Sequence, residues 1–193
     1  MRGYFGIGVE GISKSMNVGS IFRTAHAFEA EFVFTIGANY SLKEGKKSDT
    51  TGAHNHIPFY QFDGLNEMIL PKNCALVGVE LIENSIELPS FHHPSQAAYV
   101  LGPERGSLSK TMCSRCDHIV QIPTQFCINV SVAAAIIMYD RVQSRGRFFR
   151  RPERPGGPLN RLTKPFFGEQ KFRSKAKKYI SQPPLDVHPK END

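Results

Sequence analysis

Three separated segments of the sequence carry polar side chains of types that do chemistry. In the first, Asn17 precedes an apolar stripe with helical spacing, and Arg23 lies nearly opposite that stripe. Asn17 is therefore expected to be the N-cap of a helix. An arginine near the start of a helix suits binding of an anion such as a phosphate, although an ordinary exposed arginine fits the same pattern.

The other two segments follow expected strands. Gly102 and Glu104 come directly after the apolar run Ala97–Leu101, and the segment Ile122–Asn129 leads from the run His118–Gln121 into a very apolar helix. Open α/β sheets bind ligands at the carboxyl ends of their strands. We therefore expect both segments to border a ligand site, although each alone would also fit a plain turn followed by a helix cap.

Short apolar runs and amphipathic stretches alternate along the first 140 residues. Runs rich in branched and aromatic residues predict strands at Tyr4–Val9, Phe32–Ile36, Pro58–Phe62, Ala75–Val79, Ala97–Leu101 and His118–Gln121. Helices between such strands predict the α/β class with a mostly parallel sheet.

The helix expected from Asn129 to about Gln143 is apolar on nearly every face until Asp140 and Arg141. Such a helix must be covered on all sides. It is either a central core helix or a helix shared between the core and a homodimer interface, and periodicity does not separate the two.

Length and composition limit the protein class. The chain has 193 residues and 21.6 kDa, of which 40% are hydrophobic and 22% charged, as expected for one globular domain. No apolar run approaches the roughly 18 residues of a membrane span, and no signal region follows the start. Four cysteines suit a reducing compartment, so we expect a cytoplasmic protein with no membrane association.

Charge divides the chain in two. Residues 1–140 hold 10 Lys and Arg against 13 Asp and Glu, whereas residues 141–193 hold 14 against 5. Prolines and glycines also gather after Arg145, which places the boundary between a domain at 1–145 and a basic tail at 146–193, largely irregular and partly disordered. The tail interleaves cations with aromatic residues, as in 147–151 and 171–179, which favours RNA contact over a mere solubility role.

Two further patterns are interpreted as structural. Residues Gly6–Gly11 match the dinucleotide-binding spacing of glycines, but the preceding strand is too short and the helix begins too late, so a nicotinamide-dependent oxidoreductase stays a minor alternative. Cys113 and Cys116 lack the second pair that a zinc site needs, and the histidines lack metal-site spacing. We therefore expect no metal.

The three polar segments, in this order, resemble the SPOUT RNA methyltransferases, specifically the TrmH-like ribose 2′-O-methyltransferases. The resemblance covers about residues 3–145 and rests on Asn17–Ala25, Gly102–Ser109 and Ile122–Ser131. It implies a SAM-dependent methyltransferase acting on tRNA or rRNA. It also implies a C-terminal trefoil knot, a homodimer, and S-adenosylmethionine (SAM) bound in the knot.

The resemblance also implies roles for individual residues. Four residues would bind SAM: Gly102, Ile122, Ile128 and Leu101. Arg23 would be the catalytic arginine. The polar side chains that support Arg23 would be those of Asn17, Glu104 and Asn129. The chain departs from the family in having Cys127 where serine is frequent and in a shorter third segment. We also expect no N-terminal RNA-binding domain of the kind frequent in the family, and the basic tail could take its place.

Methyl transfer from a sulfonium needs alignment rather than a metal. A guanidinium is rarely deprotonated, so we expect Arg23 to anchor a phosphate and stabilise oxyanion character, while Glu104 or solvent accepts the hydroxyl proton. The alternative is a non-catalytic RNA-binding or ribosome-assembly protein that retains the fold.

Overall fold

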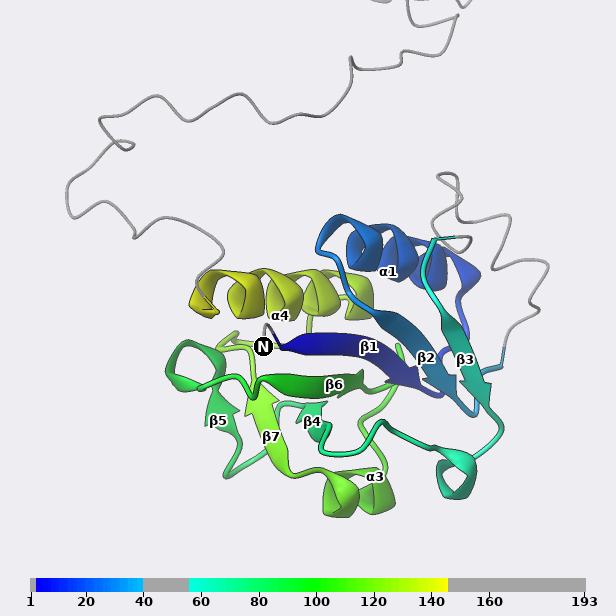
Figure 1. Ribbon diagram of the computed structural model, residues 1–193. Coiled ribbons are helices and arrows are strands. Elements are labelled where there is room, and N and C mark those ends of the chain that lie inside the picture. Colours follow the sequence, from blue (N-terminus) through cyan, green and yellow to red (C-terminus); the bar gives the residue numbers. More distant parts are fainter. Residues whose placement is uncertain (1–2, 40–55, 146–193) are drawn as a thin grey trace, which may run out of the picture. The chain divides into compact units, whose positions relative to one another are not determined.

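The computed structural model describes residues 3–39 and 56–145, which form a seven-stranded sheet with helices on both faces (Figure 1). The strand order is β3-β2-β1-β6-β4-β7-β5, and all neighbouring strands pair in parallel. The strands are β1 Tyr4–Glu10, β2 Phe32–Ile36, β3 Phe59–Phe62, β4 Ala75–Val79, β5 Ile86–Glu87, β6 Gln96–Leu101 and β7 His118–Gln121. The expected α/β class with a mostly parallel sheet is confirmed.

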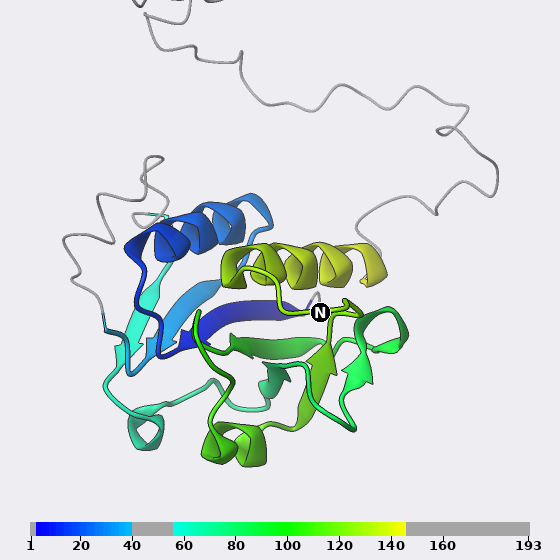
Figure 2. The ribbon, with the colours of Figure 1, turned by 180° about the vertical axis from the view of Figure 1, so that it is seen from behind.

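Helices cover the two faces unequally. Helices α1 (Ser15–Ala27) and α4 (Val130–Ser144) lie side by side on one face, and α3 (Lys110–Arg115) lies on the other (Figures 1 and 2). Short 3-10 turns occur at Leu65–Glu67 and Leu88–Ser90. Each face has its own buried apolar cluster, and the cluster beneath α1 and α4 is the larger one. The basic segment 146–193 lies outside the described residues.

Gly6 and Gly8 of the dinucleotide-like pattern lie within β1. They pair with Phe32 and Phe34 of β2. A Cβ atom at Gly6 would lie 2.2 Å from the Phe32 ring, and one at Gly8 would lie 2.4 Å from the Phe34 ring. The two glycines therefore make room for aromatic rings on a sheet face, which accounts for the pattern without a dinucleotide.

Helix α1 begins earlier than the sequence predicts. Its N-cap is Lys14, so Asn17, expected at the N-cap, lies inside the first turn. The Lys14 side chain makes no capping hydrogen bond. A carboxylate from a distant loop, described below, accepts the free N–H groups that precede the helix and replaces the local cap.

Within the described residues of the single chain, helix α4 is covered on the side that faces the sheet and exposed on the other, which excludes the purely central core helix. Asn129 is its N-cap, so the helix begins and ends within one residue of the bounds expected from the sequence. Val132 and Tyr139 are 49% and 47% exposed in the single chain. The side of α4 that faces away from the sheet therefore carries large apolar groups in contact with water.

A buried arginine fastens the end of α4 to the sheet. Arg141 is 3% exposed and donates hydrogen bonds to the carbonyls of Tyr4 and Pro94 and to the Tyr99 hydroxyl. His93 is 1% exposed and forms a hydrogen bond with the same hydroxyl at 2.6 Å. This network fixes α4 at the edge of the sheet opposite the site described next.

Candidate functional site

Four neighbouring strands end at one edge of the sheet. Their last residues are Glu10 of β1, Leu101 of β6, Val79 of β4 and Gln121 of β7. Because the strands are parallel and adjacent, the segments that follow them meet at this edge. All three polar segments singled out from the sequence begin here.

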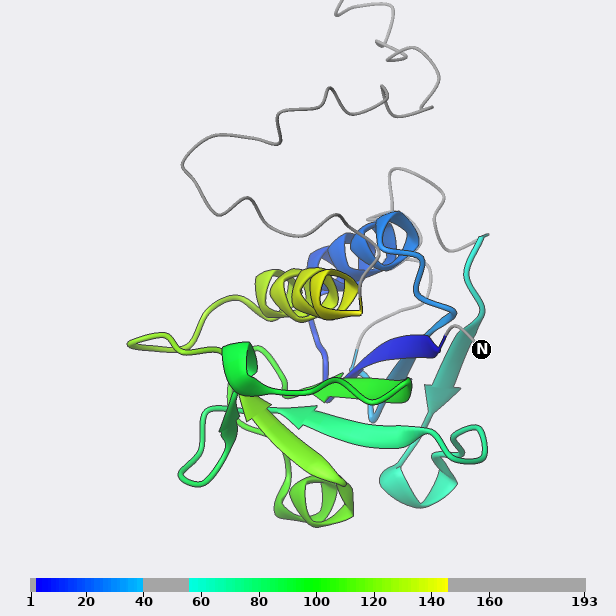
Figure 3. The same cartoon turned by 60° about the vertical axis from the view of Figure 1, so that its left-hand side comes forward.

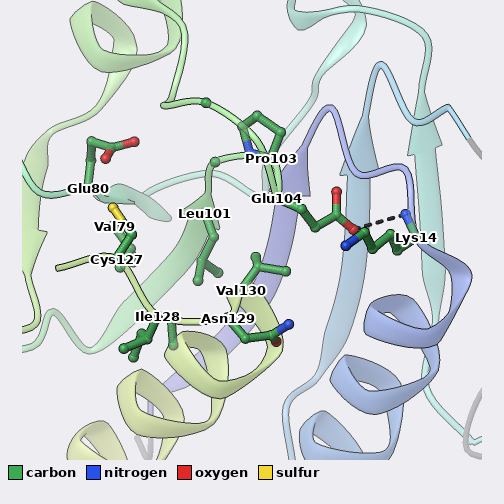
Figure 4. Close-up of a pocket in the computed structure, with 13 residues that line it drawn as sticks. Lys14, Val79, Glu80, Leu101, Pro103, Glu104, Cys127, Ile128, Asn129 and Val130 are labelled. Carbon is green, nitrogen blue, oxygen red and sulfur yellow. Dashed lines mark hydrogen bonds between the residues drawn. The ribbon is translucent and has the colours of Figure 1, made fainter.

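These segments enclose a cavity of about 190 Å³. Its walls come from the start of α1, the end of β4, the loop after β6 and the loop before α4 (Figure 4). A smaller hollow of about 90 Å³ adjoins it and shares Val79, Glu80, Cys127 and Ile128 with it. Figure 3 shows the segment 122–129 carrying the chain from β7 to α4.

Glu104 caps α1 from a distance. Its Oε2 accepts the Ser13 N–H at 3.0 Å and the Ser13 hydroxyl at 3.1 Å, and its Oε1 accepts the Lys14 N–H at 2.9 Å. Oε1 also accepts the Asn17 side-chain N–H at 2.9 Å. A carboxylate at the positive end of a helix is stabilising, so this contact joins the second polar segment to the first.

Asn17 extends the connection to the third segment. Asn17 is 7% exposed, and its Oδ1 accepts the Asn129 side-chain N–H at 3.1 Å. Asn129 in turn accepts the backbone N–H of Ser131 at 2.9 Å and thereby caps α4. A continuous chain of hydrogen bonds, from Glu104 through Asn17 to Asn129, thus links three segments that are far apart in sequence.

The hydrogen bonds also determine the charge of Glu104. Partial burial alone would raise its pKa, but hydrogen bonds from Asn17 and from the backbone of Ser13 and Lys14 outweigh burial, and the pKa of Glu104 falls below its usual value. Glu104 is therefore ionised at neutral pH. The same hydrogen bonds occupy both oxygens of Glu104 and hold its carboxylate against the start of α1.

Gly102 lets two parts of one loop approach closely. A Cβ atom there would lie 2.9 Å from the Leu108 backbone nitrogen, so a side chain does not fit. Two other carboxylates hold the same loop: Glu80 accepts the Leu108 N–H at 2.7 Å, and Glu10 accepts the Ser109 N–H at 2.8 Å. The wall of the cavity at Gly102 is therefore bare backbone in a fixed position.

The four residues expected to bind a cofactor all lie around the two hollows. Leu101, Gly102 and Ile128 line the larger one, and Ile122 and Ile128 line the smaller one. Glu104 and Asn129 also line the larger cavity. The structure thus brings together seven of the eight predicted site residues, counting Asn17 through its hydrogen bonds.

Arg23, expected to be catalytic, is the exception. It is exposed on α1 and does not line the cavity within this chain. It lies six residues beyond Asn17, which is about 9 Å along the helix axis. A role for Arg23 in chemistry therefore requires a substrate that spans this distance, or a second copy of the chain.

Sequence reasoning missed three charged residues of this region. Lys14 and Glu80 line the cavity, and Glu10 holds the loop at Ser109. Glu10 and Glu80 stand at or just after the ends of β1 and β4, so the rule that identified the other loops would have found them. The sequence around Lys14 does not mark it as a site residue, because its position at the cavity depends on where α1 begins.

The cysteine pattern does not build a metal site in the described part of the chain. Within residues 3–39 and 56–145, no group of three or more His, Cys, Asp or Glu is placed to hold a metal ion. Burial raises the pKa of Cys116 to about 12, and Cys113 also has a raised pKa, chiefly through burial.

Among the helices of this same part, none has the length and apolar character required to cross a bilayer.

Sequence comparison identifies relatives of this chain. Residues 5–139 match the family model described as the SpoU rRNA Methylase family. A putative TrmH family tRNA/rRNA methyltransferase of Staphylococcus aureus (strain COL) is 27% identical over 143 residues, covering 71% of this chain and 58% of that protein. The Staphylococcus saprophyticus protein of the same description is 28% identical, over 71% and 57%. The chain thus spans under three-fifths of the length of these relatives.

Solved structures share the fold. The SpoU methyltransferase AviRb from Streptomyces viridochromogenes, in complex with the cofactor AdoMet (SAM), matches 75% of this chain and 59% of its own, with a TM-score of 0.67 and 23% identity. A structure concerned with the 2-OH methylation of C/U34 on tRNA matches 75% of this chain and 97% of its own, with a TM-score of 0.66 and 16% identity.

Proposed function

Because the chain belongs to the SpoU rRNA Methylase family, we propose that it is a SAM-dependent methyltransferase that methylates a ribose 2′-OH of tRNA or rRNA in the cytoplasm. The observation that carries the proposal is the hydrogen-bonded chain from Glu104 through Asn17 to Asn129, beside the cavity. A plain turn and two ordinary helix caps would not need these three side chains to meet. The 2-OH chemistry of one structural neighbour supports the ribose as acceptor.

The cavity suits the methyl donor. Leu101 and Ile128 offer an apolar wall for an adenine ring, and Gly102 lines the cavity with backbone that packs closely against Leu108. Ile122 extends the apolar wall into the adjoining hollow. We assign SAM binding to these four residues.

When bound, SAM supplies a methyl group on a positively charged sulfonium, so the reaction needs no metal. The residues of this chain orient the reactants. Glu104, Asn17 and Asn129 fix the relative positions of α1, α4 and the loop after β6. Arg23 binds the phosphate next to the target ribose and stabilises negative charge on the attacking oxygen. Because both oxygens of Glu104 already accept N–H groups, we assign the hydroxyl proton to solvent.

A homodimer accounts for the exposed apolar groups near the site. Val132 and Tyr139 on α4 and Met16 on α1 are exposed, and Phe126, in the loop before α4, is 74% exposed. Large apolar side chains exposed on one region of a protein favour an interface. A second copy packed here would bring its own α1, and with it Arg23, close to the cavity. Sedimentation of the purified protein tests this assembly.

We also propose the trefoil knot that the resemblance implies. It would require the segment after β7 to pass through a loop of the preceding chain. The out-of-order placement of β6 between β1 and β4 supports a crossover of this kind. An experimental backbone trace with no such crossing would contradict it.

Deleting residues 147–193 is expected to weaken RNA binding and to flatten its dependence on salt, while SAM affinity stays nearly unchanged. Each lost phosphate contact lowers the slope of log affinity against log salt, by about 0.7 for single strands. Filter binding over a salt series measures the slope, and calorimetry measures SAM affinity. An unchanged slope would contradict an RNA-contacting tail.

Alkylation provides a direct probe of the cavity. Cys127 is exposed and lines the cavity, whereas Cys116, with a pKa of about 12, stays protonated near neutral pH. Iodoacetamide should therefore modify Cys127 first, and saturating S-adenosylhomocysteine should slow that modification at least severalfold. Peptide mass spectrometry gives the rates. Equal rates with and without the ligand would place the ligand elsewhere.

The proposed function is tested by incubating the full chain and RNA with SAM labelled in the methyl group. The expected result is label in RNA at ribose 2′ positions, lost in the Gly102→Val variant. RNA binding without label transfer would favour the non-catalytic alternative. Mapping of 2′-O-methylation in RNA from cells lacking the protein then identifies the nucleotide.

A further inference from the structure

Lys14 stands at a position that does not suit a lysine. It is the N-cap of α1, where Ser, Thr, Asp or Asn usually accepts a hydrogen bond from the helix. A cation there also faces the positive end of the helix dipole, which is unfavourable. The Lys14 side chain makes no capping bond, and within the described residues it has no salt-bridge partner. Among residues 3–39 and 56–145, neither helix stability nor an ion pair explains a lysine at this position.

The side chain of Lys14 instead borders the cavity. In Figure 4 it extends from the start of α1 on the same side as Glu104, while Glu80 lies at the other side. Among the lining residues Lys14 is the one cation, and Glu80 and Glu104 are the two carboxylates. Both carboxylates accept backbone N–H groups, and Glu104 also accepts a side-chain amide. The lysine ammonium group is thus the group left to meet a ligand anion.

We propose that Lys14 binds the α-carboxylate of the methyl donor and so directs its amino-acid end toward the start of α1. This inference rests on the proposed function. The donor carries one carboxylate and two cationic groups, which complement one lysine and two carboxylates in the lining. With the amino-acid end at Lys14, the adenosine end lies toward Ile122 and Ile128 in the adjoining hollow.

An RNA phosphate is the competing anion, and the geometry favours the donor. Lys14 shares the cavity wall with Leu101 and Gly102, whereas Arg23 lies outside the cavity. The two cations of α1 are nine residues apart, which is about 13 Å along a helix axis. They therefore serve two different anions, the donor carboxylate at Lys14 and the RNA phosphate at Arg23.

Calorimetry with the full-length Lys14→Met variant tests the inference. Methionine keeps the length and apolar stem of the side chain and removes its charge. We expect affinity for S-adenosylhomocysteine and for SAM to fall about tenfold, as for loss of a charge-assisted hydrogen bond. Affinity for decarboxylated SAM, which has the sulfonium and the amine but no carboxylate, should stay within about twofold of wild type. Lys72→Met, an exposed lysine outside the cavity, is the matched control.

The outcomes separate this inference from the proposed function. Equal losses for all three ligands, or no loss for any, would overturn the assignment of Lys14 to the carboxylate. Loss of RNA affinity with donor affinity intact would overturn it in favour of a phosphate. Failure of the wild-type chain to bind SAM and S-adenosylhomocysteine would overturn the proposed function, and the inference with it.

Discussion

Replacing Arg23 with alanine is expected to lower kcat/KM for methyl transfer to RNA by about a hundred- to a thousandfold, the usual cost of losing one group that stabilises an oxyanion. Affinity for SAM should not change, because Arg23 lies outside the cavity. Single-turnover kinetics with labelled SAM and calorimetry measure the two effects separately. Lys72→Ala serves as a control for the loss of one exposed cation.

The Arg23→Lys variant separates charge from geometry. A guanidinium binds a phosphate through two parallel N–H groups, and an ammonium group does not. We therefore expect the lysine variant to stay close to the alanine variant. Substantial retained activity would show that charge alone matters and would contradict bidentate binding.

Mixed dimers test which cavity Arg23 serves. Because Arg23 lies outside the cavity of its own chain, we expect it to act in the cavity of a partner. A dimer of one Arg23→Ala chain and one Gly102→Val chain would then have one site with both a free cavity and an arginine. Neither variant alone would have such a site. Activity of the mixed dimer no higher than that of the two separate variants would place Arg23 at its own cavity.

The sequence predicts this fold well because its strands carry strong local signals. Runs such as Ala97–Leu101 are buried on both faces of a parallel sheet, so nearly every residue in them is apolar, and their ends match the structure closely. The placement of the site follows from the same signals. Once the strands are parallel, the loops that begin at Gly102 and Ile122 must open at one edge.

Features that depend on distant partners were not predictable in this way. The sequence predicts the N-cap of α1 at Asn17, but the structure places it at Lys14, because Glu104, about ninety residues away, accepts the N–H groups there. No local pattern reveals a cap of that kind. The choice between a core helix and an interface helix stayed open for a related reason, because apolar residues such as Val132 look the same in a core and on a surface that meets another chain.

Asn17 is the residue on which the three polar segments depend, and replacing it with aspartate is expected to destabilise the protein strongly. Asn17 donates to Glu104 and accepts from Asn129 while 7% exposed. An aspartate would lose the donor and place a second carboxylate beside Glu104. Two carboxylates at this separation do not both ionise readily. We expect the free energy of unfolding at pH 7 to fall by about 3 kcal/mol, and methyl transfer to fall with it.

The pH dependence of this loss follows from the pKa directions. In the wild type the pKa of Glu104 is lowered, so its contribution to stability is present above the pKa of the unfolded chain and is lost as pH falls. In Asn17→Asp one carboxyl has a raised pKa, so that variant gains stability, relative to its state at pH 7, as pH falls and a proton is shared.

The difference between the two proteins should therefore shrink from pH 7 toward pH 4, as measured by urea denaturation over a pH series. Asn17→Ala is the matched control, because it removes both hydrogen bonds without adding charge and should be less destabilising than Asn17→Asp at pH 7. Equal stability of Asn17→Asp and Asn17→Ala at pH 7 would mean that the introduced carboxylate finds another partner. It would also mean that the Asn17 amide does not hold Glu104 in place. The hydrogen-bonded chain would then be a consequence of the packing of α1 against α4 rather than a cause of it.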